Sequence, residues 1–484
     1  MKVRTRFAPS PTGYMHIGNL RTALFEYLIA KSQGGDFILR IEDTDSNRKV
    51  DGSVDVIFNT LKIAGLQHDE GPDIGGPYGP YIQSQRKCCY LDYAKKLIDN
   101  GKAYYCFCSK DRLEQLTVDT EKNFKKYDRH CLHLSPEEIA EKLAAGAPYV
   151  IRQLIPEGET TFVDEVYGTI TVNNSELDDQ ILIKSDGMPT YNFANVIDDH
   201  LMEITHVVRG CEYISSTPKY NLLYDAFGWE IPKYVHLPLV LNADGNKLSK
   251  RKGDASFEDL LAQGFLPEAI INYIALLGWN PPNDTREFFT LEELKTVFTI
   301  KGLNKSPSVF DITKLTWMNG EYFKKMDFDK FKLLAIDTIN NAIKKYDVNV
   351  EQIARMVQTR ISFLEDIYEL VDFFDNIPVY ESNLYVNKKM KTDQVNALEY
   401  LIELKEKLNS IEIWNNDIIY GETIKLSEEL NVKKGALLWV LRVALSGKIA
   451  TPCGASEIAE ILGKSETLSR IKKGISLLEQ SKID

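Results

Sequence analysis

Residues 3–45 read VRTRFAPSPTGYMHIGNLRTALFEYLIAKSQGGDFILRIEDTD, and this stretch decides the fold. The alternating residues 3–8 predict a strand, and a loop with two prolines and a glycine follows it. Residues 37–41 predict a second, buried strand. Between the strands a helix is predicted, because apolar side chains recur at helical spacing at Leu20, Ala23, Leu24, Tyr27 and Leu28. Strand, helix and strand in this order form a βαβ unit, which predicts a parallel sheet with a right-handed crossover.

Both predicted strands end in segments that carry functional groups. The first is followed by His16-Ile17-Gly18-Asn19 and the second by Glu42-Asp43-Thr44-Asp45. Ligands of open parallel sheets bind beyond the carboxyl ends of the strands. Gly18 permits close approach to the backbone, the helix N-terminus offers N–H groups to a phosphate, and His16 can donate to a phosphate oxygen. Taken alone, the four residues favour a plain loop with a surface histidine.

A second basic motif lies far downstream, at residues 244–253, DGNKLSKRKG. Lys247 and Lys250 flank a serine in a loop that has a glycine at each end. Two mobile ammonium groups suit a departing pyrophosphate, whose negative charge grows as it leaves. By itself this motif is also consistent with a solvated basic turn.

Together the two motifs resemble the His-Ile-Gly-His and Lys-Met-Ser-Lys-Ser signatures of class I aminoacyl-tRNA synthetases. Asn19 and Arg251 depart from these signatures, and such variants are usual in the glutamate branch; Asn19 is therefore a weaker catalytic candidate than His16. Four longer strings, at 6–13, 39–45, 191–210 and 237–253, resemble the glutamyl-tRNA synthetase family, and the resemblance runs over the whole chain. It implies ATP-dependent conversion of L-glutamate to glutamyl-adenylate and transfer to the 3′ end of tRNA(Glu). It also implies that the 2′-hydroxyl is the acceptor and that tRNA must be present before glutamate is activated.

The resemblance also implies the site residues. A glutamate pocket needs cations for two carboxylates and an anion for the ammonium, which arginine forks and a glutamate can supply. The positions that match the family's amino-acid pocket are Arg6, Ser10, Glu42, Tyr191, Asn195 and Arg209. Those that match its ATP site are Thr12, His16, Gly18, Glu212 and Lys250, and the predicted catalytic residues are His16, Lys247 and Lys250. Mg²⁺ is expected on the ATP phosphates without a dedicated protein cage. Each position also has an ordinary structural explanation, such as a surface ion pair.

A zinc knuckle is predicted from Cys106-x-Cys108 and Cys131-x-His133. These four side chains have the type and number of ligands that a closed, structural zinc site needs, and some bacterial members of the family have such a site. The alternative is free cysteines in a small core, which is how we interpret Cys88, Cys89, Cys211 and Cys453.

Composition is consistent with a globular protein of several domains: 484 residues, 44% hydrophobic, 26% charged and a net charge of −12. An acidic chain is an unusual RNA binder, but total charge does not describe local patches. Seven cysteines fit a reducing compartment, and we expect neither a signal peptide nor an apolar run of about 20 residues that would span a membrane. The predicted location is the cytoplasm, with a monomeric enzyme as in most of the family.

The predicted fold is multidomain α/β. A Rossmann-like parallel-sheet catalytic domain holds an inserted α+β acceptor-binding domain, and an all-α anticodon-binding region follows. The predicted ranges are 1–80 and 191–255 for the catalytic halves, 81–190 for the insertion with the zinc knuckle, 256–325 for a helical stem-contact domain, and 326–484 for the anticodon-binding domain. Within them we expect a helix with Ser84 as N-cap and Gly101 as its end, strands at 161–173 and 180–196, and a helix over 217–227.

Three alternatives remain open from the sequence. The enzyme could also charge tRNA(Gln), and Arg360 lies in the region where the family reads the anticodon. It could be a nucleotidyltransferase that shares the His-Ile-Gly loop, or a paralogue with another acceptor or no catalysis. A glutamine-specific relative would be expected to carry β-barrels in the last third, where no strand pattern is seen, and a shorter relative that modifies a tRNA base lacks that third.

Overall fold

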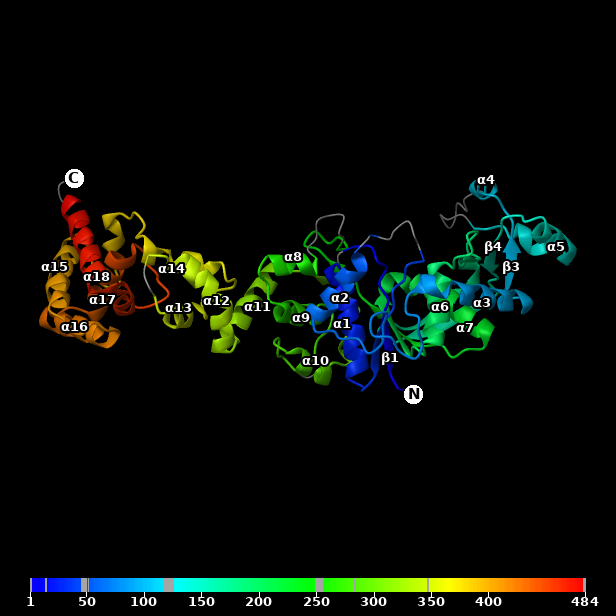
Figure 1. The fold of residues 1–484 in the computed structure, drawn as a ribbon, viewed down its shortest axis with the longest axis horizontal. Helices are drawn as coiled ribbons and strands as arrows, with labels where there is room; N and C mark the ends of the chain where they lie inside the picture. Colours follow the sequence, from blue (N-terminus) through cyan, green and yellow to red (C-terminus); the bar gives the residue numbers. More distant parts are fainter. Residues whose placement is uncertain are drawn as a thin grey trace. The chain divides into compact units, whose positions relative to one another are not determined.

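The computed structural model describes residues 2–13, 15–44, 50, 52–116, 126–248, 256–282, 284–345 and 348–481. The chain forms two compact units, Met1–Ile312 and Thr313–Asp484 (Figure 1). The division lies N-terminal to the change to helical sequence predicted near 326. The finer division into five ranges stays a prediction.

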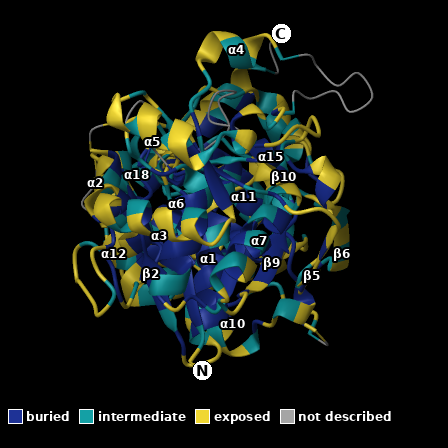
Figure 2. Cartoon of the chain, turned by 90° about the vertical axis from the view of Figure 1, so that its right-hand side faces the viewer, coloured by how far each residue is buried: buried dark blue, intermediate teal, exposed yellow. Residues whose placement is uncertain are grey.

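The predicted βαβ unit is confirmed at the N-terminus. Strands β1 (Arg4–Phe7) and β2 (Asp36–Leu39) pair in parallel, and helix α1 (Ile17–Lys31) connects them. Most of α1 is buried, from Leu20 to Ala30 (Figure 2). This burial explains why apolar residues recur on more than one side of the helix.

The first unit also contains a mixed sheet of four strands in the order β6-β5-β9-β8, whose parallel strands confirm the α/β class. Its strands are β5 (Glu159–Asp164), β6 (Gly168–Asn173), β8 (His206–Gly210) and β9 (Lys233–Leu237). β8 and β9 are parallel, β9 and β5 are parallel, and β6 is an antiparallel edge strand. The Thr205 N–H donates to the Arg4 carbonyl at 3.0 Å, so β1 lies beside β8. The carboxyl ends of β1, β2, β8 and β9 therefore surround one region.

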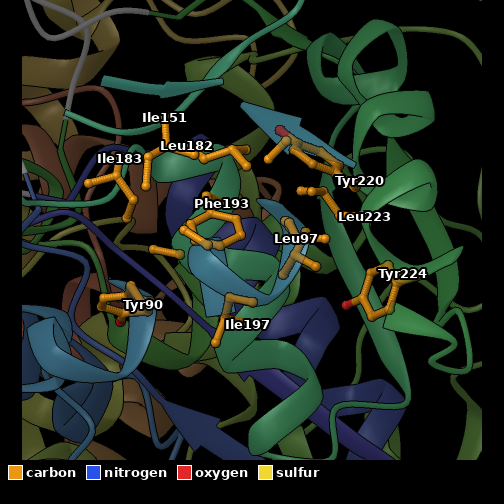
Figure 3. Packing of buried hydrophobic residues seen from close by; sticks show 14 residues of the cluster. Tyr90, Leu97, Ile151, Leu182, Ile183, Phe193, Ile197, Tyr220, Leu223 and Tyr224 are labelled. Carbon is orange, nitrogen blue, oxygen red and sulfur yellow. The ribbon is translucent and has the colours of Figure 1, made fainter. Parts of the chain in front are cut away.

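A second, antiparallel sheet belongs to the inserted segment and consists of β3 (Ala103–Cys106), β4 (Val150–Gln153) and β7 (Ile181–Ile183). Its inner face packs against α3 (Lys87–Asp99), α6 (Tyr191–Leu201) and α7 (Thr217–Phe227). Figure 3 shows Phe193 in the middle of this core, among Ile183, Leu97 and Ile197. By contrast, α5 (Pro136–Ala144) has no buried residue and is coloured mainly as exposed in Figure 2.

Two local predictions were wrong. Ser84 does not cap the helix: it lies in the 3-10 helix Gln83–Arg86, where its N–H and hydroxyl donate to Asp43 at 2.8 and 2.7 Å, and α3 begins at Lys87. Residues 191–196 are not a strand but the start of α6. The signal for a helix was present in the sequence, because Phe193, Val196, Ile197 and Leu201 recur at helical spacing. The helix over 217–227 and strands within 161–173 are confirmed.

The remaining elements of the first unit are short. They are α2 (Ser53–Ile63), α4 (Lys110–Glu114), α8 (Phe257–Ala262), α9 (Pro267–Ala275), α10 (Leu291–Val297), β10 (Val240–Leu241) and β11 (Ser308–Val309).

The second unit is helical, as predicted, and its described residues contain no β-strand. Its helices are α11 (Ile312–Lys325, which starts at the division), α12 (Phe328–Ala342), α13 (Val350–Val357), α14 (Asp366–Asp375), α15 (Gln394–Asn409), α16 (Asn416–Glu429), α17 (Lys434–Ser446) and α18 (Ala455–Gln480). In the described part of the whole chain, no helix has the length and apolar character required to cross a bilayer.

One buried arginine joins three helices of this unit. Arg470 on α18 is 1% exposed and donates to the carbonyls of Phe373 and Phe374 at the end of α14 and of Leu445 at the end of α17, at 2.6 to 2.7 Å. These carbonyls lie in the last turns of their helices, where no backbone N–H of the same helix is available to donate to them. Arg470 therefore ties the C-terminal ends of two helices to a third.

Arg470→Met is expected to lower the free energy of unfolding by about 3 to 5 kcal/mol, because it leaves buried carbonyls without their charged donor. Urea denaturation of the full chain, followed by circular dichroism, measures this. Lys472→Met on the exposed side of α18 is the control and should change stability by less than about 0.5 kcal/mol. Equal effects of the two substitutions would contradict the assigned role.

Candidate functional site

A cleft of about 360 Å³ opens where β1, β2, β8 and β9 end. Its lining comes from five separate parts of the chain: the end of β1 with the following loop and α1, Glu42 beyond β2, Tyr191 in the segment 191–201, the end of β8 with the residues after it, and the segment after β9. Ten of the predicted site residues line it: Arg6, Ser10, Thr12, His16, Gly18, Glu42, Tyr191, Arg209, Glu212 and Lys247. Asn195 does not line the cleft and is 2% exposed within α6, and Lys250 lies outside the described residues.

The start of α1 forms one wall of the cleft. His16 is the N-cap residue, and its Nδ1 accepts from the Asn19 N–H at 3.2 Å. A Cβ at Gly18 would lie 3.0 Å from His16 Cε1, so glycine is the residue that lets the imidazole take this position. The positive end of the helix and its N–H groups therefore face the cleft together with the imidazole, a suitable surface for phosphate.

The opposite wall carries an ion pair between Glu212 and Lys247. Lys247 Nζ lies 2.6 Å from Glu212 Oε1, and both side chains are about half exposed. Burial opposes ionisation of the carboxyl, but the neighbouring ammonium holds the pKa of Glu212 below its ordinary value. A residue predicted for the ATP site, Glu212, and a predicted catalytic residue, Lys247, are therefore direct neighbours.

Arg6 belongs to a buried network of two arginines and three carboxylates. Its Nε donates to Asp199 Oδ1 at 2.9 Å, and its Nη1 lies 3.3 Å from Glu26 Oε1. Arg40 donates to the same Asp199 oxygen at 2.7 Å and to Glu42 Oε1 at 2.9 Å. Although burial opposes it, the two guanidinium groups hold the pKa of Asp199 below its ordinary value. The charge of Arg6 is therefore largely neutralised by protein groups.

Glu42 is the acid of this network that titrates near neutral pH. Burial raises its pKa to about 7, and the attraction of Arg40 and Arg6 only partly offsets this. Burial also raises the pKa of Glu26. A cation that enters the cleft next to Glu42 would stabilise its ionised form, as the predicted ammonium site requires.

Arg209 has different surroundings from Arg6. Its Nε donates to His236 Nε2 at 3.2 Å and its Nη2 to Thr217 Oγ1 at 2.9 Å, and its guanidinium lies 4.6 Å from the centre of the Tyr220 ring. All these partners are neutral. Within the described part of the chain Arg209 forms no ion pair, so its positive charge remains for a ligand in the cleft.

Sequence reasoning missed Glu26, which lines the cleft, and four residues that lie outside its lining: Arg40, Asp164, Asp199 and His236. The available signal was the presence of charged residues inside buried apolar runs, such as Arg40 in FILRI and Asp198-Asp199 in NVIDD. The two aspartates face different arginines, because Asp198 accepts from Arg86 Nε at 2.7 Å while Asp199 binds Arg6 and Arg40.

The predicted metal ligands gather only in part. The Sγ atoms of Cys106, Cys108 and Cys131 lie within 4.8 Å of one another and form a group that could hold a metal ion. His133 is exposed and does not belong to this group. The hydroxyl of Tyr127, which sequence reasoning missed, lies 3.3 Å from the Sγ atoms of both Cys106 and Cys108.

Comparison with known proteins gives consistent matches over the whole chain. The family model of the class I (E and Q) tRNA synthetase catalytic domain matches residues 2–317, and that of an anticodon binding domain matches 329–475. The chain is 59% identical to a glutamate–tRNA ligase of Clostridium tetani, with 99% of this chain and 98% of the relative covered. A glutamate–tRNA ligase of Clostridium botulinum is 58% identical, with 99% of both chains covered. The crystal structure of a glutamate–tRNA ligase from Elizabethkingia meningosepticum in complex with its amino acid is similar at a TM-score of 0.89 and 35% identity, covering 99% of this chain and 100% of that one.

Proposed function

Because the chain belongs to the class I tRNA synthetases for glutamate and glutamine, we propose that it is the ligase that joins L-glutamate to tRNA(Glu), using ATP, in the cytoplasm and as a monomer. The observation that supports this most is the cleft, which brings together an uncompensated arginine, a titratable glutamate and a helix N-terminus. Glutamate is favoured over glutamine because the described part of the second unit is helical and carries no β-barrel.

The first step forms a mixed anhydride. The α-carboxylate of glutamate attacks the α-phosphorus of Mg·ATP, the bond to the β-phosphate oxygen breaks, and pyrophosphate leaves with the electron pair. His16, the start of α1, Lys247 and Lys250 bind the phosphates, with Thr12, Gly18 and Glu212 completing the nucleotide site. No covalent nucleophile of the protein is needed, because positioning and charge neutralisation supply the rate enhancement.

The amino acid is held by complementary charges. Arg209 binds a carboxylate, Glu42 binds the ammonium, and Ser10 and Tyr191 orient the ligand as neutral donors. Arg6 also lines the cleft but is engaged by Asp199 and Glu26, whereas Asn195 is buried and acts from behind this surface. In the second step the 2′-hydroxyl of the terminal ribose attacks the acyl carbon and AMP leaves. Activation requires bound tRNA, as the family resemblance implies.

The test is charging of purified tRNA with radiolabelled glutamate and ATP, run in parallel on tRNA(Glu) and tRNA(Gln). Charging of tRNA(Glu) alone would establish a discriminating ligase, and charging of both would establish the relaxed form. Charging of neither by folded, metal-replete protein would overturn the proposal in favour of a paralogue with another acceptor.

Arg360 lines a groove in the second unit with Lys448 and Thr451, where we propose that the anticodon is read.

The KM for glutamate should depend on pH through Glu42. Since the pKa of Glu42 is raised to about 7, lower pH protonates the carboxylate that holds the ammonium. We expect KM to rise about tenfold for each unit that the pH falls below about 7, at saturating ATP and tRNA. Glu42→Gln should raise KM by about a hundredfold and remove this dependence. A wild-type KM that stays constant from pH 5.5 to 8 would contradict the role.

The three cysteines of the inserted segment are proposed to bind structural zinc. Three thiolates within 4.8 Å and a fourth donor fit the closed tetrahedral site, and the fourth donor is either His133, as the sequence pattern predicts, or Tyr127. The bound ion would neutralise the thiolates and fix the loop that connects β3 to the rest of the segment. No step of the reaction passes through it.

Metal analysis of the purified protein should find about one equivalent of zinc. Cys131→Ala should abolish binding, while Cys88→Ala, on an exposed cysteine, should leave it unchanged. Comparison of Tyr127→Phe with His133→Ala then identifies the fourth ligand. Much less than one equivalent in protein prepared without chelators would rule out the site.

A further inference from the structure

The surroundings of Arg209 form a chain of buried hydrogen bonds that crosses two strands. Arg209 on β8 and His236 on β9 are direct partners in the parallel register, and Arg209 Nε donates to His236 Nε2 at 3.2 Å. His236 Nδ1 in turn lies 2.7 Å from Asp164 Oδ2, on β5. The three side chains are 6%, 0% and 1% exposed, so water does not compete for these contacts.

The hydrogen-bond pattern assigns the tautomer of His236. Because Nε2 accepts from Arg209, the ring proton must sit on Nδ1, where it donates to Asp164. Burial lowers the pKa of His236, so the imidazole stays neutral, which leaves Nε2 as an acceptor. A protonated ring would instead present a second cation to Arg209.

Asp164 is itself held in place from all sides. Its Oδ2 also accepts from the His236 N–H at 3.1 Å, and its Oδ1 accepts from the N–H groups of Val166 and Tyr167 at 2.9 and 2.7 Å. Such a carboxylate cannot rotate away from the imidazole without breaking several hydrogen bonds. It therefore fixes both the orientation and the tautomer of His236, as a carboxylate does for a metal-bound histidine.

A second neutral acceptor holds the other arm of the guanidinium. Thr217, at the start of α7, donates its hydroxyl proton to the Tyr213 carbonyl at 2.9 Å, so its oxygen lone pairs face Arg209 Nη2 at 2.9 Å. The plane of the guanidinium is thus defined by two acceptors, neither of which carries a charge.

The contrast with Arg6 explains the use of neutral acceptors. A carboxylate beside Arg209 would orient it equally well but would neutralise the charge, as Asp199 and Glu26 do for Arg6 in the same cleft. A neutral imidazole keeps the anion of Asp164 one ring away. The guanidinium therefore attracts the side-chain carboxylate of glutamate more strongly than the neutral side-chain amide of glutamine.

We propose that Asp164, His236 and Thr217 are positioning residues that present the charged guanidinium of Arg209 to the side-chain carboxylate of the substrate and thereby set the preference for glutamate over glutamine. This inference rests on the proposed role of Arg209 in binding a substrate carboxylate.

The test compares two substitutions at His236, each of which preserves one of its two side-chain hydrogen bonds. His236→Asn keeps an amide N–H for Asp164 but offers no acceptor to Arg209, whereas His236→Gln places a carbonyl oxygen near the position of Nε2. We expect His236→Asn to raise the KM for glutamate about 30-fold, with the KM for ATP changed less than about twofold, and His236→Gln to recover most of the loss. The ratio of kcat/KM for glutamate over glutamine should fall in parallel. A structural defect alone would lower kcat/KM for glutamate and glutamine equally. It would also not be reversed by the carbonyl acceptor that His236→Gln supplies.

Thr217→Val is the second variant, because it is nearly isosteric and removes only the acceptor for Nη2; about a tenfold rise in the KM for glutamate is expected. Arg209→Leu is the reference. If Arg209→Leu leaves the KM for glutamate unchanged, the proposed role of Arg209 fails. If it raises KM while folded His236→Asn and Thr217→Val do not, or if both variants raise the KM values for glutamate and ATP equally, the positioning inference alone is overturned.

Discussion

Replacement of Arg209 by leucine is expected to raise the KM for glutamate by about a thousandfold and to leave the KM for ATP within about twofold. The loss corresponds to about 4 kcal/mol, which is reasonable for a buried, charge-assisted contact to a carboxylate made by two N–H groups. The folded protein should be no less stable, because the substitution removes a buried cation that the described protein groups do not neutralise. Charging kinetics at saturating tRNA, together with thermal melting, measure both quantities.

Arg6→Leu is the matched control, and it should fail in a different way. Arg6 is 3% exposed and pairs with Asp199 and Glu26. Its removal leaves Asp199 paired with Arg40 and leaves the buried Glu26 without an ion pair among the described residues. A loss of about 3 to 5 kcal/mol of stability is expected, with a clear drop in melting temperature. The opposite result, a stable Arg6→Leu with a large change in KM and an unstable Arg209→Leu, would show that the roles of the two arginines are reversed.

This difference between the two arginines illustrates what the sequence could not provide. Spacing predicted the βαβ unit and that the segments after β1 and β2 meet, because parallel strands bring their carboxyl ends to one edge. Arg209 and Glu212, at β8, were expected in the same site only from the family resemblance. Which carboxylate neutralises which arginine depends on contacts between residues 193 positions apart, such as Arg6 and Asp199. No local pattern encodes such a contact.

The two local errors have different origins. Ser84 is a residue type that often caps helices, but here its N–H and hydroxyl donate to Asp43, which lies in a loop distant in sequence. The start of α6, by contrast, was predictable, because Phe193, Val196, Ile197 and Leu201 recur at helical spacing. At the cysteine cluster the fold brings the hydroxyl of Tyr127 to the thiols, which no sequence pattern indicated, and His133 stays a predicted ligand.

Lys250→Ala is expected to reduce tRNA-dependent ATP–pyrophosphate exchange by about a hundred- to a thousandfold, mainly in kcat. Lys250 lies outside the described residues, so the argument rests on the motif and on its neighbour Lys247, which pairs with Glu212 at the wall of the cleft. Negative charge on pyrophosphate grows as the bond to the α-phosphorus breaks. An ammonium that meets this charge stabilises the transition state more than the bound ATP, so its loss lowers the rate constant more than the affinity.

The control is Lys252→Ala, which removes the same charge just outside the KLSKR motif and should reduce exchange by less than about threefold, because salt screens a charge that does not contact the phosphates. The dissociation constant for tRNA should stay within about twofold of the wild-type value in both variants, since one lysine contributes little to a large RNA contact surface. If Lys250→Ala weakened tRNA binding as much as it slowed exchange, the residue would hold the fold or the RNA rather than the pyrophosphate. Equal effects of the two substitutions on exchange would indicate that the loop acts through its total charge, and that no single lysine meets the leaving group.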